Sequence, residues 1–143
     1  MNDYTYHDDP DKREDSRYLH RGVFRWDMAE YRHDHSSRQG KLFQGLKRLE
    51  NIRITEPCFD TNADVQVLDS GDKRVLALCR RSAGRELICL FNFSSDFVRA
   101  GINREGGYTE LMYGVKYNDI HSIELWPNGF AWLLQDKDVL EGD

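Results

Sequence analysis

The hydrophobic periodicity of this sequence changes once, at Pro57, and this change limits the folds that are open to it. Before Pro57, large apolar residues recur at spacings of three and four, as on one face of a helix: Leu42, Phe43, Leu46, Leu49 and Ile52. After Pro57, apolar residues alternate with polar ones or form short β-rich runs. The pattern predicts one amphipathic helix followed by a small antiparallel β-domain.

The helix has signals at both ends. Ser36 or Ser37 can cap its first turn, because a serine hydroxyl accepts a hydrogen bond from a free backbone amide there. Pro57 cannot continue a helix and keeps Glu56 out of helical geometry. We therefore expect the helix to end near Thr55.

Short strands fill the rest of the chain. A hairpin joins 75–79 to 87–93 through Ser82-Ala83-Gly84-Arg85. The other strand candidates, between turn signals, are 65–67, 97–100, 109–113, 122–125 and 130–134. About six or seven such strands predict an antiparallel β-sandwich. We expect much of its core to come from Val75, Leu76, Leu78, Leu90, Phe91, Phe93, Leu111, Ile123, Leu125, Trp132 and Leu134.

Residues 1–35 contain few aliphatic side chains. The charged run from His7 to Asp15 cannot bury enough apolar surface to order itself, so we expect a loop. A short amphipathic turn is expected after Phe24, at Trp26, Met28 and Tyr31. The predicted fold class is therefore mainly β: an antiparallel β-sandwich preceded by one amphipathic helix and a charged loop.

Charge and hydropathy exclude several classes of partner. The chain has 20 basic and 25 acidic residues, without the basic excess that binding to a phosphate backbone requires. It has no run of about 18 apolar residues that could cross a bilayer. Its first residues, Met1 to Tyr6, lack the basic and apolar regions of a signal peptide. We expect no nucleic-acid partner, no membrane partner and, by default, a cytoplasmic location.

Three cysteines, Cys58, Cys79 and Cys89, cannot all pair within one chain. We interpret them as reduced, buried thiols, as expected in a reducing compartment. Cys79 and Cys89 flank the hairpin. They face each other if its loop has three residues and point to opposite faces of the sheet if it has two.

The histidines suggest a metal site only weakly. His20, His33 and His35, with Asp34 nearby, lie in a polar segment. Imidazole is a common metal ligand, but the H-x-H spacing comes with no cysteine and no fixed fourth ligand. We therefore expect neither a metal nor a cofactor.

Several segments resemble one enzyme family. Asp15-Ser16-Arg17-Tyr18-Leu19-His20-Arg21 resembles the loop after the eighth barrel strand of amylosucrases and related sucrose-cleaving enzymes. These belong to the α-amylase superfamily, glycoside hydrolase family thirteen. Residues 40–49 are similar to the family's eighth barrel helix, and 53–59 to the segment that leaves the barrel. The sequence departs from the family pattern at Tyr18, where Trp is commoner, and at Gly22, where Pro is frequent.

The resemblance continues into the β-domain. Leu90-Phe91-Asn92-Phe93-Ser94 looks like the family's central strand, which ends in Asn-Phe-Ser. Leu125-Trp126-Pro127 and Phe130-Ala131-Trp132-Leu133 resemble its closing strand pair. The resemblance implies that residues 1–58 are a remnant of a catalytic barrel, its loop and last helix. It implies that residues 59–143 are the C-terminal β-sandwich domain.

The same resemblance fixes what chemistry to expect. The family uses a nucleophilic carboxylate, a proton-donating carboxylate and a third carboxylate, carried on the fourth, fifth and seventh barrel strands. The matched segments begin after the eighth strand, so we expect no catalytic residue and no activity from this chain alone. Arg17 matches a substrate-binding arginine that closes the glucosyl pocket by pairing with a carboxylate elsewhere in the barrel.

Two functional hypotheses follow. The first is a C-terminal part of a sucrose-active α-glucosyltransferase or glycoside hydrolase, whose β-domain buttresses the barrel and whose partner is sucrose or α-glucan. The alternative is a free-standing α-glucan-binding module that uses surface aromatics. Trp126 and Tyr117 lie near turn signals and are expected to be exposed, whereas Trp132 is expected in the core.

The helix also predicts an interaction. The stripe of Leu42, Phe43, Leu46 and Leu49 is larger than the apolar patches that soluble monomers usually expose. We expect it either to fold back onto the chain's own sandwich or to form a homodimer through this helix face.

Overall fold

A computed structural model describes residues 3–20 and 25–136. The chain divides into two compact units, the first ending at Gln44 and the second beginning at Gly45. Among the described residues, no helix is both long enough and apolar enough to cross a membrane.

The first unit consists of short helical turns. These are η1 (Thr5–Asp8), η2 (Ser16–His20), α1 (Trp26–Ala29) and η3 (Glu30–His33), and none of them contains a buried residue. Aspartate side chains hold several turns: Asp3, Asp9, Asp15 and Asp34 each accept a hydrogen bond from the backbone amide two residues later. The expected charged loop is therefore a series of locally bonded turns without an apolar core.

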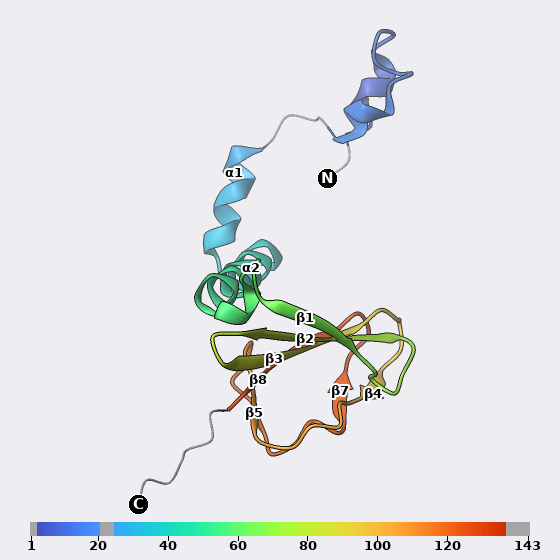
Figure 1. Cartoon of the computed structure of the whole chain (residues 1–143). Coiled ribbons are helices and arrows are strands. Elements are labelled where there is room, and N and C mark those ends of the chain that lie inside the picture. Colours follow the sequence, from blue (N-terminus) through green and yellow to red (C-terminus); the bar gives the residue numbers. More distant parts are fainter. Residues whose placement is uncertain (1–2, 21–24, 137–143) are drawn as a thin grey trace, which may run out of the picture. The chain divides into compact units, whose positions relative to one another are not determined.

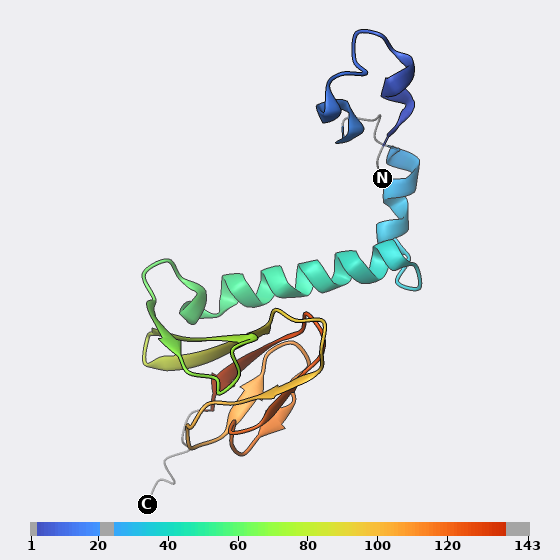
Figure 2. The same cartoon turned by 90° about the vertical axis from the view of Figure 1, so that its right-hand side faces the viewer.

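The helix α2 spans Arg38–Thr55. Ser37 provides the cap, because its Oγ accepts a hydrogen bond of 2.9 Å from the amide of Gly40. The helix ends at Thr55 as expected, and Pro57 begins the short helix η4 (Pro57–Phe59). The second half of α2 belongs to the same unit as the β-domain (Figure 2).

Eight strands make up the β-domain in the described part of the chain. They are β1 (Asp64–Leu68), β2 (Val75–Ser82), β3 (Arg85–Asn92), β4 (Val98–Ala100), β5 (Tyr108–Glu110), β6 (Lys116–Tyr117), β7 (Ile123–Leu125) and β8 (Phe130–Gln135). One sheet has the order β1-β2-β3-β8-β5-β6, and β4 and β7 form a second, two-stranded sheet (Figure 1). All pairs are antiparallel, which confirms the predicted sandwich.

The hairpin between β2 and β3 has a two-residue loop. Ser82 pairs with Arg85, and Ala83 and Gly84 both adopt positive φ, 51° and 70°. These angles are those of a type I′ turn, whose twist matches that of the flanking strands. Cys79 therefore pairs with Ile88 rather than with Cys89, and the two thiols lie on opposite faces of the sheet.

The main core lies between the two sheets. It is built mainly from aliphatic residues, with Tyr108 as its largest member: Val75, Ala77, Cys79, Ile88, Leu90, Val98, Ala100, Ile102, Tyr108, Ile120, Ile123, Leu125, Ala131 and Leu133. Two residues predicted for the core are instead exposed, Leu76 at 38% and Phe93 at 73%. Leu76 alternates with the inward-facing Val75 and Ala77, and Phe93 lies one residue beyond β3.

A second cluster covers the opposite face of the large sheet. Its buried members are Cys58, Leu87, Cys89 and Trp132. Leu78, Phe91, Leu111 and Leu134, predicted for the sandwich core, pack here. Because both faces of β3 are covered, Leu87 to Leu90 form an unbroken buried run.

Part of the helix stripe belongs to this second cluster. Leu49 and Ile52 pack against it from the second half of α2. Leu42, Phe43 and Leu46 remain 64%, 38% and 56% exposed. Within the second unit, the C-terminal end of the stripe thus folds back onto the sandwich.

Candidate functional site

Arg17, the expected substrate-binding residue, lies in η2. Its guanidinium forms a forked pair with the neighbouring Asp15, with Nε 2.8 Å from Oδ1 and Nη2 2.6 Å from Oδ2. The Arg17 side chain is 71% exposed. Arg21 and Gly22, which continue the matched segment, lie outside the described residues, as does Phe24.

The histidines lie apart from any ligand cluster. In the described part of the chain, no three His, Cys, Asp or Glu side chains come close enough to hold a metal ion. The ring of His33 lies edge-on to Phe43 at 6.3 Å, and its Nε2 is 4.0 Å from Glu30.

The cysteines are unreactive by environment. All three lie within the described residues as buried free thiols. Burial raises the pKa of Cys58 and of Cys79 to about 11, and that of Cys89 to about 12. Because the thiolate is the reactive form, none of them is suited to act as a nucleophile at neutral pH.

Two buried glutamates support loops. Glu56 pairs with Arg85 at 3.0 Å and accepts a hydrogen bond from the amide of Cys58. Glu110 accepts hydrogen bonds from the amides of Met112, at 2.9 Å, and Tyr113, at 2.7 Å. Both carboxylates are thereby committed to holding turns.

Glu86 is the centre of a third polar group. Its carboxylate is 2.7 Å from Arg81 and 3.7 Å from Arg104, and it accepts hydrogen bonds from Tyr108 and Cys79. Burial raises the pKa of Glu86, but the hydrogen bonds from Arg81 and Cys79 outweigh burial, and the net pKa lies below its usual value. Burial, with Glu86 nearby, raises the pKa of Tyr108 to about 12. This arrangement stabilises a fixed ion pair at one end of the sandwich.

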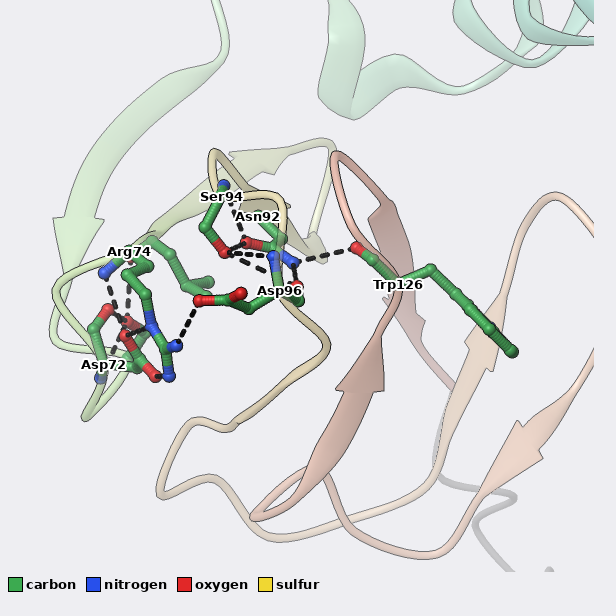
Figure 3. Close-up of polar contacts among 8 residues, drawn as sticks. Asp72, Arg74, Asn92, Ser94, Asp96 and Trp126 are labelled. Atoms are coloured by element: carbon green, nitrogen blue, oxygen red, sulfur yellow. Dashed lines mark hydrogen bonds and ion pairs between the residues drawn. The ribbon is translucent and has the colours of Figure 1, made fainter.

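Asn92, the asparagine of the Asn-Phe-Ser segment, connects two loops. It is 3% exposed, and its Nδ2 donates hydrogen bonds of 2.8 Å to the carbonyls of both Asp96 and Trp126 (Figure 3). Its Oδ1 accepts a hydrogen bond from the amide of Ser94. Sequence reasoning used this asparagine only as a marker of the family. Its position at the end of a buried strand is the signal that could have indicated a structural role.

A second polar contact steadies the first of these loops. Arg74 pairs with Asp72 at 2.6 Å and with Asp96 at 3.3 Å (Figure 3). The side-chain hydrogen bond from Arg74 lowers the pKa of Asp72 to about 2. The loop that carries Asp96 is therefore held from both sides, by Arg74 and by Asn92.

The two loops that Asn92 connects carry an exposed pair of aromatic side chains. Trp126 is 74% exposed, as expected, and Phe97 is 46% exposed. The centroids of the two rings are 5.6 Å apart, and the rings are perpendicular, with an interplanar angle of 89°. Tyr117 differs from expectation, since it is half-buried against the main core. Trp132 is buried as predicted, but in the second cluster.

A row of aromatic rings runs along the outer face of the large sheet. The distance between ring centroids is 6.4 Å from Phe93 to Phe91, 6.5 Å from Phe91 to Phe130 and 5.3 Å from Phe130 to Trp132. Phe59 completes it, 4.6 Å from Trp132. The row is buried at the Trp132 end and exposed at Phe93 and Phe130, so it extends the second cluster onto the surface.

Comparison with solved structures shows where this fold occurs. The chain matches AmyP, solved in complex with maltose, with a TM-score of 0.58 and 20% identity over 73% of this chain and 22% of AmyP. It matches the trehalulose synthase MutB from Pseudomonas mesoacidophila, with a TM-score of 0.53 and 19% identity over 63% of this chain and 17% of MutB. It also matches the α-glucosyl transfer enzyme XgtA, with a TM-score of 0.54 and 16% identity over 66% of this chain and 18% of XgtA.

All three are enzymes of the α-amylase family, glycoside hydrolase family thirteen, so the expected resemblance is confirmed at the level of the fold. The chain spans about a fifth of the length of each. No protein-family model matches the sequence.

Proposed function

We propose that this chain is the C-terminal, non-catalytic part of an amylosucrase-like enzyme of the α-amylase superfamily. In this proposal residues 59–143 form the β-sandwich that buttresses the catalytic barrel. Residues 1–58 supply the barrel's last loop and helix. The shared fold and the family-like segments at 15–21 and 90–94 support the assignment.

The aromatic row on the outer face of the large sheet carries the proposal. A sheet that is apolar on both faces needs a covering layer on each side. The small sheet covers one face, and Leu49, Ile52 and Phe59 cover only part of the other. Phe93 and Phe130 continue this apolar surface beyond the cover, as expected where a larger body docks.

Sucrose is the proposed substrate of the complete enzyme, on the basis of the Asp15-Ser16-Arg17-Tyr18 segment. Arg17 would exchange its local partner Asp15 for a carboxylate of the barrel pocket. A guanidinium suits this exchange because it stays charged and offers a rigid fork of donors. The three free cysteines support a reducing, cytoplasmic location.

The proposal predicts that the isolated chain is inactive. Retaining cleavage of a glucosidic bond requires a nucleophilic and a proton-donating carboxylate on either side of that bond. The buried Glu56 and Glu110 are bound to Arg85 and to backbone amides instead. Purified chain incubated with sucrose should release no glucose or fructose by sugar chromatography. Turnover that follows the protein through purification would contradict the proposal.

A further inference from the structure

The outer surface of the small sheet groups two aromatic and two charged side chains. Arg99 of β4 pairs with Glu124 of β7 in the strand register. Phe97 directly precedes β4 and Trp126 directly follows β7, two residues from Arg99 and Glu124. Exposed and buried residues alternate along 97–100 and 123–126, which places all four side chains on the same face. All are exposed, by 46% for Phe97 and 74% for Trp126 and, in their side chains, by 69% for Arg99 and 53% for Glu124. We call these four residues the β4–β7 platform.

The inward face of the same strands explains why the platform is fixed. Val98 and Leu125, which pair with each other, are each 2% exposed in the main core. Burial of these side chains determines which face of each strand points outward. The platform residues are therefore held outward by the core.

The aromatic end of the platform is also rigid. Asn92 ties the carbonyl of Trp126 to that of Asp96, which precedes Phe97. The amide of Gly129 donates a hydrogen bond of 2.8 Å to the carbonyl of Trp126. A side chain at Gly129 would place its Cβ 2.8 Å from that same oxygen, so only glycine fits this turn. A ligand that stacks on Trp126 would have little loop motion to arrest on binding.

The charged end supplies hydrogen-bonding groups beside the rings. Arg99 Nε and Nη2 both donate to Glu124 Oε1, at 3.0 and 2.6 Å. Opposite charges cancel across this pair, so the platform does not favour a charged ligand. Its exposed guanidinium and carboxylate can still donate to and accept from hydroxyl groups.

We infer that the β4–β7 platform is a carbohydrate-binding site that takes a glucosyl unit of an α-glucan. The face of an indole carries negative charge density, which suits the C–H bonds on the apolar face of a pyranose ring. The perpendicular ring of Phe97 borders that face, and Arg99 and Glu124 can bind the sugar hydroxyls. A few polar groups beside an aromatic surface are the usual composition of a small-ligand site.

The size of the platform favours a sugar over a protein. Stable protein interfaces bury about 800 Å² on each partner, whereas one aromatic side chain offers about 150–250 Å². Two partly exposed rings and one ion pair match a mono- or disaccharide unit. The α-linkage rests on the proposed function, whereas the binding of a sugar ring rests on the geometry of the platform.

Titration of the full chain with maltoheptaose tests this inference, followed by calorimetry and tryptophan fluorescence. Saturable binding to the wild type is expected, and Trp126→Ala should weaken it by about tenfold, the effect of losing one ring contact. Trp26→Ala is the matched control, because Trp26 has a similar exposure of 76% and lies outside the platform. It should bind as the wild type does, and far-UV circular dichroism should show that both variants are folded.

Three results would overturn the inference. They are the absence of saturable binding, equal binding by Trp126→Ala and the wild type, and equal binding of the β-linked cellopentaose. The last would remove the α-glucan assignment. None of them bears on the inactivity of the chain towards sucrose, so failure of the platform and failure of the proposed function are distinguishable.

Discussion

Trp132 links the sandwich to its outer layer at the scale of one residue. It is 8% exposed and contacts Phe59 and Phe130. Its Nε1 has no hydrogen-bond partner among the described residues. Trp132→Ala should therefore lower the free energy of unfolding by about 3–5 kcal/mol, the range for loss of a buried aromatic.

Trp132→Phe is the matched variant. It keeps most of the ring volume and removes the unpartnered N–H, so the loss should stay below about 1.5 kcal/mol. Urea unfolding of both variants measures the difference. Equal midpoints for Trp132→Ala and the wild type would show that Trp132 does not support the second cluster.

Glu86 makes stability depend on pH. Because its folded pKa lies below the usual value of 4.5, its contribution is present above pH 4.5 and is lost as the pH falls through the folded pKa. Glu86→Gln should cost about 1–2 kcal/mol at pH 7, since it weakens the bond to Arg81.

Urea unfolding at pH 7 and pH 3 measures this effect. The gap between wild type and Glu86→Gln should narrow at the lower pH. The exposed Glu105→Gln should change stability by less than about 0.5 kcal/mol at either pH. A gap that stays constant with pH would contradict the lowered pKa.

Single residues also show what alternation can and cannot predict. The inward positions of Val75, Leu90, Ile123 and Leu125 agree with the sequence pattern. The prediction that Leu76 and Phe93 lie in the core was wrong, because a run of apolar residues does not reveal which positions face a core. In β3 the ambiguity is greatest, since its buried run at 87–90, covered on both faces, contains no charged residue to mark the pleat.

At the scale of elements, the β2–β3 turn contains a strained residue. Ala83 adopts a φ of 51°, in the left-handed region that a Cβ disfavours. Asn tolerates this region and is favoured before Gly in type I′ turns. Ala83→Asn should therefore raise the free energy of unfolding by up to about 1 kcal/mol.

The neighbouring glycine gives a control of opposite sign. An added Cβ at Gly84 has no atom within 4 Å, so Gly84→Ala changes only the backbone preference at a φ of 70°. It should lower stability by about 1 kcal/mol. Thermal unfolding of both variants measures these opposite changes in stability. A stabilised Gly84→Ala would contradict the assigned type I′ turn.

Helix and strand boundaries were predictable where the sequence carries chemical signals. Pro57 marks the end of α2, and the Ala83-Gly84 pair marks the hairpin. The sequence does not distinguish Ser36 from Ser37 as the N-cap of α2. The hydrogen bond from the amide of Gly40 to Ser37 Oγ identifies Ser37 as the cap. The strand β6 was missed, because its two residues, Lys116 and Tyr117, are too few to show alternation.

At the scale of the whole molecule, the uncovered end of the α2 stripe supports self-association of the isolated chain. Leu42, Phe43 and Leu46 remain exposed, and burial of each is worth about 1.5–3 kcal/mol. Like patches pair most readily about a two-fold axis. The wild type should sediment as a dimer and Phe43→Glu, Leu46→Glu as a monomer. A monomeric wild type would contradict the dimer.

The site was harder to predict than the fold. Arg17 came from a resemblance, and its pairing with Asp15 depends on a local turn that the motif does not encode. The exposure of Trp126 followed from its turn signals. The perpendicular contact between Trp126 and Phe97 could not be predicted in this way. It depends on the pairing register of β4 and β7, which lie more than 20 residues apart in the sequence.

The size and activity of the native polypeptide test the central proposal most directly. An antibody raised against the β-sandwich would precipitate the native protein from its source, and mass spectrometry would give its length. Because 63–73% of this chain covers 17–22% of its solved neighbours, the proposal predicts a polypeptide roughly three to four times as long as this chain. The precipitate should cleave sucrose or transfer its glucosyl group. A native chain of 16.8 kDa without such activity would contradict the account.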